Sequence, residues 1–364
     1  MIMCLIMLIT GIVWPIVEMI ASKVRQTITN KMRVINYKHY LKRKRKKLIG
    51  VLADEKSSLE FNNLSLEACQ DSILRRNSYL FSRNIGSKLF LNIKIGVGKI
   101  PSSINFLYER PDLIVDNDKL LNDIDKLIAD FKYIEDAPFS LSLKDYNSIA
   151  FINSNGLYDL YLKSIILQLI TFHDYESLKL VILTSEFSNL CKIKNINHCW
   201  NNDKTFRFFA SNLNDAENVS SELMKIFNDY NSNEKTNKSN RTYYLIITDF
   251  IAKYKNLKII DSVIHSNGDS DFGIIMFSSR IVDIPIGCKT FVDYNNEKAS
   301  FFQAEMDENS IVNFKPELIG DNINFDSCIN AMADIPIKVN EGGSKGNLPD
   351  KLGFLEMYNV GNLE

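Results

Sequence analysis

The N-terminal 47 residues constrain this chain more than any other segment. A 20-residue apolar run, Met1 to Ile20, leads into residues 23 to 47, which hold eleven Lys or Arg and no Asp or Glu. An apolar helix of about 20 residues spans about 30 Å, the thickness of a hydrocarbon core. A basic cluster beside one end of such a helix stays in the cytoplasm. We therefore predict a transmembrane helix over residues 1–22, a single pass through the cell membrane, and a cytoplasmic C-terminal body.

Two other interpretations of the apolar run fit the sequence less well. A cleaved signal peptide carries its positive charges before the apolar core, and nothing basic precedes Lys23. A buried helix of a soluble protein is the other alternative, since Pro15 and Glu18 interrupt the run. Such a helix is not normally followed by a cluster like that of residues 43–47, so the membrane span is favoured.

Charge is divided unevenly along the chain. Residues 1–53 carry a net charge of +10, and the remaining 311 residues carry 32 basic and 43 acidic groups. A body this acidic is a poor general binder of nucleic acid, so no nucleic-acid partner is expected. The basic stretch is better matched to the anionic lipid bilayer, where each Lys or Arg near the surface contributes about 1 kcal/mol.

The six cysteines form no C-x-x-C pair. Cys191, His198 and Cys199 lie close together in the sequence, but their spacing fits no standard zinc site. Reduced thiols of a cytosolic protein are the interpretation that the sequence favours, and no metal site is predicted.

Helical and extended patterns suggest five parts. After the membrane helix, residues 23–85 are read as a basic helical stalk, with a corner at Gly50 and residues 54–58 that turns the chain into a second helix over Leu59 to Phe81. Residues 86–147 are read as a subdomain of strands and one helix. Its strands are predicted at Leu89–Ile95, Ile104–Tyr108 and Phe139–Leu143, its helix at Lys119–Phe131, and a loop at Gly96–Pro101.

Residues 148–326 alternate short apolar strands with helices. Strands that are apolar throughout and separated by helices predict a mainly parallel sheet covered on both faces, hence an α/β fold. We expect three of them, Ile149–Ile152, Leu178–Leu183 and Tyr243–Thr248, to be parallel neighbours. Further strands are predicted at Phe206–Ala210, Phe272–Phe277, Thr290–Val292 and Ser300–Gln303. Residues 327–364, rich in Gly, Pro and Asn, are read as a linker.

The segment from Ile149 to Phe172 has the strand–loop–helix layout of a phosphate-binding loop. Such a loop needs G-x-x-x-x-G-K-[ST], because its glycines let backbone N–H groups converge on phosphate and its Lys meets the β- and γ-phosphates. Here residues 153–158 have one Gly and no Lys. The apolar strand that ends at Asp249 has the outline of an Mg²⁺-holding strand, although an apolar strand ending in Asp is common. We read Asn155, Gly156 and Asp249 as a vestigial nucleotide pocket.

The chain offers no other persuasive site. Residues 96–99 and 342–346 combine Gly with Lys, but neither lies between an apolar strand and a helix, so both are read as loops. None of the four His residues has a Ser or Cys partner at a spacing that would indicate a catalytic pair. His173 is expected to cap a helix. No catalytic triad or carboxylate pair is evident, so no catalytic residue is assigned.

Several stretches carry a resemblance to EssC-like type VII secretion proteins, which are FtsK/SpoIIIE-type membrane ATPases. They are Trp14–Val17, the basic stretch Tyr37–Lys47, Leu80–Gly86, Leu167–His173, Trp200 and Leu348–Gly361. The resemblance implies that residues 148–326 are a degenerate, P-loop-like (RecA-like) ATPase domain and that residues 327–364 lead to a missing ATPase module. The chain looks like a middle piece of such a protein, either a gene fragment or a partial record. The ATPase motif residues of the family have no counterparts here.

The resemblance implies a membrane-anchored, non-catalytic coupling or assembly domain of a type VII secretion motor, with other membrane subunits as partners and homo-oligomers in the full-length context. No cofactor is expected on this interpretation. Two alternatives stay open: an ATP- and Mg²⁺-binding domain with a non-standard loop, and a DNA-handling protein of the FtsK type. The missing Lys disfavours the first, and the acidic body disfavours the second.

Overall fold

The computed structural model describes residues 11, 13–108, 119–154, 158–185, 189–232, 241–266, 270–295, 297–304 and 311–336. The chain divides into two compact units. The first consists of residues 1–62 and 98–138, and the second of residues 63–97 and 139–364.

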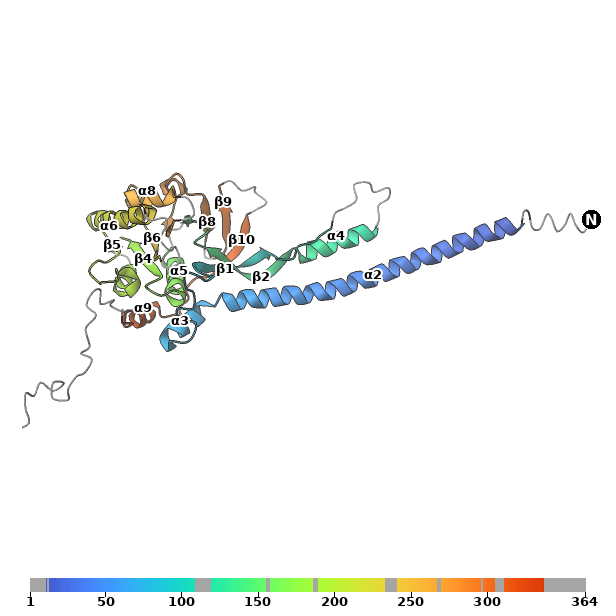
Figure 1. Cartoon of the computed structure of the whole chain (residues 1–364), viewed down its shortest axis with the longest axis horizontal. Coiled ribbons are helices and arrows are strands. Elements are labelled where there is room, and N and C mark those ends of the chain that lie inside the picture. Colours follow the sequence, from blue (N-terminus) through green and yellow to red (C-terminus); the bar gives the residue numbers. More distant parts are fainter. Residues whose placement is uncertain are drawn as a thin grey trace, which may run out of the picture. The chain divides into compact units, whose positions relative to one another are not determined.

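A single long helix, α2 (Trp14–Asn62), dominates the first unit (Figure 1). The predicted corner at Gly50 is wrong, because α2 runs through it without a break. One Gly inside a helix costs only about 1 kcal/mol, which its neighbours with high helix propensity offset. Within the second predicted helix of the stalk, Leu59 to Phe81, the structure has α3 (Leu66–Arg75), which belongs to the other unit.

Half of the predicted membrane span, residues 1–10 and 12, lies outside the described part of the chain. Among the helices that are described, none combines the length and the apolar character needed to cross a bilayer.

The helix α4 (Lys119–Phe131) matches its predicted bounds and packs on α2 within the first unit. Arg45 of α2 donates to Asp130 of α4 at 2.7 Å, and its guanidinium lies 5.8 Å from the centroid of the Phe131 ring. Lys56 of α2 donates to the backbone oxygen of Glu135, just beyond α4. The basic side chains of α2 thus have specific partners where α4 lies against it.

Ten strands form one sheet, in the order β2-β1-β10-β9-β8-β3-β7-β6-β4-β5. The strands are β1 (Asn92–Pro101), β2 (Tyr133–Ser142), β3 (Ser148–Ile152), β4 (Leu178–Leu183), β5 (Phe209–Ala210), β6 (Tyr243–Thr248), β7 (Phe272–Ser278), β8 (Thr290–Tyr294), β9 (Ala299–Gln303) and β10 (Val312–Pro316). The run from β8 to β5 is parallel, and β9 pairs antiparallel with both β8 and β10. The predicted α/β class with a mainly parallel sheet is therefore confirmed.

The three strands predicted to be parallel neighbours are parallel members of this sheet, and β4 and β6 are adjacent. The prediction is wrong for β3, because β7 inserts between β3 and β6. The order of strands in a sheet depends on long-range packing and on chain connections, which a list of apolar segments does not contain.

Two local predictions in the first half of the chain are also wrong. No strand forms at Ile104–Tyr108, and the predicted loop at Gly96–Pro101 is the second half of β1. Gly96 is needed there because a Cβ atom at this position would overlap the backbone oxygen of Lys315. This glycine allows β10 to approach β1 closely rather than marking a turn.

Helices cover both faces of the parallel part of the sheet (Figure 1). One face packs on α3, α5 (Asp159–Phe172) and α9 (Phe325–Ala333), and the other on α6 (Leu213–Ser232), α7 (Ile251–Tyr254) and α8 (Lys258–Ile264). Adjacent residues of one strand face opposite cores, as Ile246 and Ile247 of β6 do. Every residue of β4, β6 and β7 is buried.

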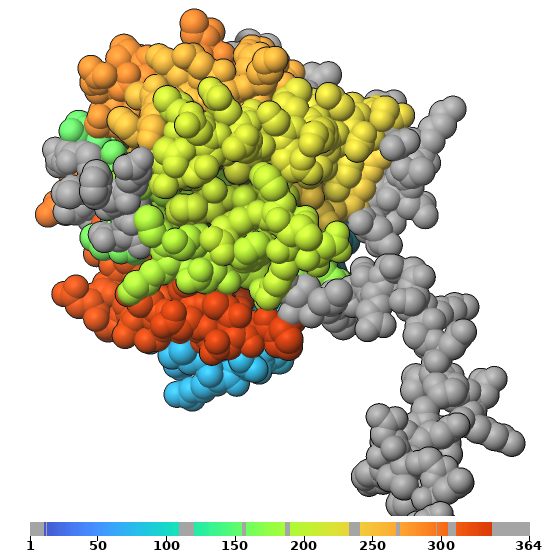
Figure 2. All heavy atoms as spheres, turned by 90° about the vertical axis from the view of Figure 1, so that its left-hand side faces the viewer, coloured from blue at the N-terminus to red at the C-terminus, as the bar shows by residue number. Residues whose placement is uncertain are grey.

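The folded body continues past the predicted start of the linker. Helix α9 covers residues 325–333, and its Cys328, Ile329 and Met332 are buried in the core. Figure 2 shows this red segment between α3, in blue, and the yellow-green segment that includes the 3-10 helix η2 (Asn189–Asn195), and α9 contacts both elements. The linker prediction is therefore wrong for residues 327–333, whereas residues 337–364 lie outside the described part.

His173 joins three segments inside the core. As predicted, it caps α5: its backbone N–H and its Nδ1 both donate to the oxygen of Leu169, at 3.1 and 3.0 Å. Its Nε2 accepts from the backbone N–H of Leu91 at 2.9 Å, and its own oxygen accepts from Nε2 of His198 at 2.8 Å. These contacts define one neutral tautomer for each ring.

Acid should destabilise the second unit through these two histidines. Burial lowers the pKa of His173 to about 3 and that of His198 to about 4, from a usual 6.5. The unfolded chain therefore binds these protons first, so stability is complete above pH 6.5 and falls as the pH drops toward 4. Denaturant unfolding between pH 7 and 4 should show this slope, and His173→Gln should flatten it.

One buried charge interrupts the apolar strand β4. Lys179 is 1% exposed, and its Nζ has no hydrogen-bonding partner among the described residues, although it lies 5.6 Å from the centroid of the Tyr175 ring. Burial lowers the pKa of this ammonium to about 8. Keeping it charged in the folded state at pH 7 therefore costs free energy.

Replacing this lysine should stabilise the protein. Lys179→Met retains the aliphatic stem and removes the buried charge, so the free energy of unfolding at pH 7 should rise by about 1–3 kcal/mol. Lys225→Met, at an exposed position of α6, is the matched control and should change it by less than about 0.5 kcal/mol. Equal effects of the two substitutions in denaturant titrations would show that Lys179 carries no burial penalty.

Candidate functional site

The carboxyl ends of the parallel strands are the expected location of a site, because open α/β sheets bind ligands there. Since β3, β7, β6 and β4 are parallel neighbours, the residues that follow them share one edge of the sheet. These are Asn153 after β3, Asp249 after β6 and Thr184 after β4. Asn153 and Thr184 are fully buried, and Asp249 is half-buried.

Asp249 is hydrogen-bonded to the next strand of the sheet. Its Oδ2 accepts from Oγ1 of Thr184 at 2.6 Å. The Thr184 backbone oxygen accepts from the hydroxyl of Tyr254, also at 2.6 Å, and the Tyr254 side chain is fully buried. The carboxylate is thus tied by a buried chain of polar contacts to α7, the helix that follows it.

The charge of the same carboxylate is felt at the start of α5. Tyr158, the residue before α5, has a raised pKa because its hydroxyl is partly buried and because Asp249 is negatively charged. Asp159 occupies the first turn of α5 and pairs with Lys163 at 2.7 Å. The helix end that attracts phosphate in a phosphate-binding loop therefore already carries a carboxylate, and the neighbouring Lys is engaged by it.

This geometry has a direct spectroscopic consequence. Asp249→Asn removes the negative charge beside Tyr158, so the pKa of that hydroxyl should fall toward its usual value of 10. The titration is followed by NMR of ¹³C-labelled tyrosine. Asp229→Asn, on α6, serves as the control and should leave the Tyr158 curve in place. An unchanged curve in Asp249→Asn would contradict the proximity of the two side chains.

Of the residues predicted for a vestigial nucleotide pocket, Asp249 lies at this edge of the sheet. Asn155 and Gly156 lie outside the described residues. Sequence reasoning missed Thr184, Tyr158 and Asp159. A carboxylate in the first helical turn was visible in the sequence, but the partnership of Thr184 with Asp249 depends on the pairing of β4 with β6.

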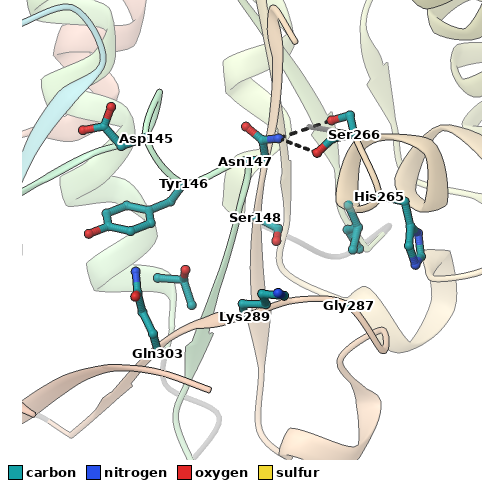
Figure 3. Close-up of a pocket in the computed structure, with 11 residues that line it drawn as sticks. Asp145, Tyr146, Asn147, Ser148, His265, Ser266, Gly287, Lys289 and Gln303 are labelled. Carbon is teal, nitrogen blue, oxygen red and sulfur yellow. Dashed lines mark hydrogen bonds between the residues drawn. The ribbon is translucent and has the colours of Figure 1, made fainter. Parts of the chain in front are cut away.

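A cavity of about 520 Å³ lies at the opposite edge, where β3 and β8 begin. Figure 3 shows its polar lining, which includes Ser148, Lys289, Gln303 and Asn147. Asn147 donates from Nδ2 to the backbone oxygen of Ser266 at 2.9 Å, while its buried Oδ1 has no partner among the described residues.

A glycine shapes the rim of this cavity. Gly287 has a φ of 114°, and a Cβ atom there would lie 2.9 Å from Cγ2 of Ile264. No motif in the sequence indicates the cavity, because its lining comes from four separate segments. Its size and polarity suit a small polar molecule.

The cysteines and histidines in the described part of the chain show no metal-binding arrangement. Within the described ranges, no group of three or more His, Cys, Asp or Glu side chains is placed to hold a metal ion. Burial raises the pKa of the Cys199 thiol to about 12, which keeps it protonated. His198 already donates from Nε2 to the oxygen of His173.

Two of the stretches that carry the sequence resemblance meet in the core. The backbone N–H groups of Phe81 and Arg83 donate to the oxygens of Thr171 and Phe172, at 2.8 and 2.9 Å. The Arg83 guanidinium stacks 3.8 Å from the centroid of the Phe172 ring. These stretches therefore maintain the fold around the end of α5.

Fold and site together define an α/β protein with a large, mostly parallel sheet and a polar carboxyl edge. Comparison with known proteins confirms the resemblance found in the sequence. The chain is 23% identical over 358 residues, 96% of its length, to the type VII secretion system protein EssC of Staphylococcus aureus (strain NCTC 8325 / PS 47). It is 20% identical over 353 residues, 92% of its length, to the ESX secretion system protein EccC of Geobacillus thermodenitrificans (strain NG80-2).

The chain spans about a quarter of the length of these curated relatives, 24% of the first and 23% of the second. No family model matches it. Among solved structures, it is similar to the cytoplasmic domain of the type VII secretion ATPase EccC of Thermomonospora curvata, with a TM-score of 0.49 and 10% identity, over 76% of this chain and 35% of that one.

Proposed function

We propose that this chain is a non-catalytic coupling or assembly domain of a type VII secretion motor and contributes to protein export. Its relatives EssC and EccC are named as secretion system proteins and are similar to it over nearly its whole length. In this proposal the α/β unit is a degenerate, P-loop-like ATPase domain, and a membrane-spanning helix over residues 1–22 anchors it with the body in the cytoplasm. Other membrane subunits, and further copies in the full-length context, are the proposed partners.

The charge at the carboxyl edge is the observation that carries the non-catalytic role. Asp159 lies in the first turn of α5, and the charge of Asp249 raises the pKa of Tyr158, the residue just before that helix. A helix N-terminus supplies only about half a positive charge, and the Asp159 carboxylate offsets it. Lys163, one turn further along α5, is already paired with Asp159. At this helix end an ATP phosphate would therefore lose its hydration beside a carboxylate whose neighbouring Lys is already engaged.

Nucleotide binding remains the second candidate, because Asp249 ends a buried parallel strand, as an Mg²⁺-binding carboxylate does in P-loop enzymes. In this chain its Oδ2 accepts from Thr184.

The test is a direct measurement of ATP binding and hydrolysis by the intact chain. With Mg²⁺ present, calorimetry should detect no binding in the micromolar range, and phosphate release should stay at background. Asp249→Asn should change neither result. Micromolar affinity that falls on this substitution would contradict the non-catalytic proposal and support the nucleotide-binding alternative.

The export role needs its own measurement. Loss of the chain from its host should reduce export of the proteins that depend on the type VII machinery, and the Asp249→Asn chain should restore it. Unchanged export without the chain would contradict a coupling role, whatever the result with ATP.

A further inference from the structure

An arginine without a counter-charge lies on a short hairpin of the second unit. Arg207 is half-buried, and among the described residues it forms no ion pair and donates no hydrogen bond. Its Nε is enclosed, whereas its two Nη groups reach solvent. A guanidinium is always charged, and a partly buried one normally has an acceptor for its N–H groups. Arg207 therefore lacks the partner that its chemistry requires.

Trp200 holds this guanidinium in place. Cζ of Arg207 lies 4.1 Å from the centroid of the Trp200 ring, and the two residues face each other across an isolated antiparallel bridge. Stacking of this kind covers one face of the guanidinium and leaves its N–H groups uncovered. The indole N–H of Trp200 also has no acceptor among the described residues. Two neighbouring donor groups are therefore unused within the described part of the chain.

The hairpin that carries the pair is closed by its own hydrogen bonds. The backbone N–H of Asn201 donates to the oxygen of Phe206 at 3.0 Å, and that of Phe208 donates to the oxygen of Cys199 at 2.7 Å. The side-chain Oδ1 of Asn201 accepts from the backbone N–H groups of Thr205 and Phe206, at 2.9 and 3.0 Å. The pair is thus positioned before any ligand arrives, which lowers the entropic cost of binding.

The segment around the pair is basic, although the rest of the body is acidic. Residues 189–209 hold four Lys or Arg and one acid, whereas residues 54–364 as a whole hold 32 basic and 43 acidic groups. Lys192 is paired with Asp326, but Lys204 is exposed at the turn of the hairpin. The segment belongs to the yellow-green region on the face that Figure 2 shows. A local positive charge on an acidic body favours an anionic partner at this place.

The neighbouring thiol does not neutralise this charge. Burial raises the pKa of Cys199 to about 12, although the positive charges of Lys179 and Arg207 act in the opposite direction. The thiol therefore stays protonated and uncharged at neutral pH. The charge of Arg207 remains available to an anion that approaches from solvent.

We propose that Trp200 and Arg207 form a docking site for a carboxylate side chain on an acidic segment of a partner protein. The carboxylate accepts from the Nη groups of Arg207, in the two-pronged geometry that suits a guanidinium. Trp and Arg are the residue types that most often carry the binding energy of protein interfaces. Lys204 attracts further acidic groups of the same segment. The inference goes beyond the proposed coupling function and does not depend on it.

A purely structural role for Arg207 is the competing explanation. Stacking on Trp200 accounts for one face of the guanidinium but leaves its Nη groups without acceptors. If stacking were the whole role, the pair would show no preference for a carboxylate over a neutral amide. The experiment is built on that difference.

Tryptophan fluorescence of the intact chain tests the site. The chain has two Trp residues, so Trp14→Phe leaves Trp200 as the single indole. This variant is titrated with two end-blocked peptides, Gly-Glu-Glu-Glu-Gly and Gly-Gln-Gln-Gln-Gly. The glutamate peptide should change the Trp200 emission in a saturable way, with at least tenfold higher affinity than the glutamine peptide.

Substitutions in the Trp14→Phe chain assign the binding to Arg207. Arg207→Gln should weaken binding of the glutamate peptide at least tenfold. Arg207→Lys should weaken it several-fold, because Lys keeps the charge but not the planar fork. Arg75→Gln, at an exposed arginine of α3, is the matched control and should leave the affinity unchanged. Denaturant unfolding of each variant shows that the unit is still folded.

The opposite results would overturn the proposal. No change in emission with the glutamate peptide, or equal affinities for the two peptides, would leave Arg207 with a stacking role alone. The same would follow if both Arg207 variants bound as tightly as the parent, or if Arg75→Gln weakened binding equally. Displacement of the peptide by inorganic phosphate at concentrations where acetate has no effect would make the site a phosphate site. Because no nucleotide is present and export is not measured, none of these results bears on the coupling proposal.

Discussion

Burial of the parallel strands on both faces is the constraint on which the rest of the second unit depends. Because β4, β6 and β7 are buried at every position, helices must cover both sides of the sheet. Solvent and ligands can then reach the strands only at their ends. The carboxyl edge with Asp249 and the cavity at the amino edge follow from this arrangement.

The two edges differ in how their polar groups are used. At the carboxyl edge, Oδ2 of Asp249 accepts from Thr184, and Asp159 is paired with Lys163. At the amino edge, Asn147 leaves a buried oxygen without a partner among the described residues. Buried polar atoms of this kind normally meet water or a ligand.

The first unit is stabilised in a different way from the second. Helix α2 has no buried residue, so its stability comes from helix propensity and from contacts with α4 such as that of Arg45 with Asp130. Its long surface exposes both apolar side chains, such as Ile28, and basic ones, such as Lys42. A helix of this kind is suited to contacts with other surfaces, whereas the α/β unit encloses its apolar groups.

The sequence by itself determined the α/β class, most of the strands, helix α4 and the resemblance to EssC-like proteins, because apolar periodicity and local propensity act within short segments. It also identified His173 as a helix cap. Only the tertiary structure decided that β7 separates β3 from β6, that α2 continues through Gly50 and that Gly96 lies inside a strand. It also revealed the partnership of Thr184 with Asp249, the buried charge of Lys179 and the amino-edge cavity. Each of these depends on which distant segments meet, and that information resides in long-range packing rather than in any local pattern.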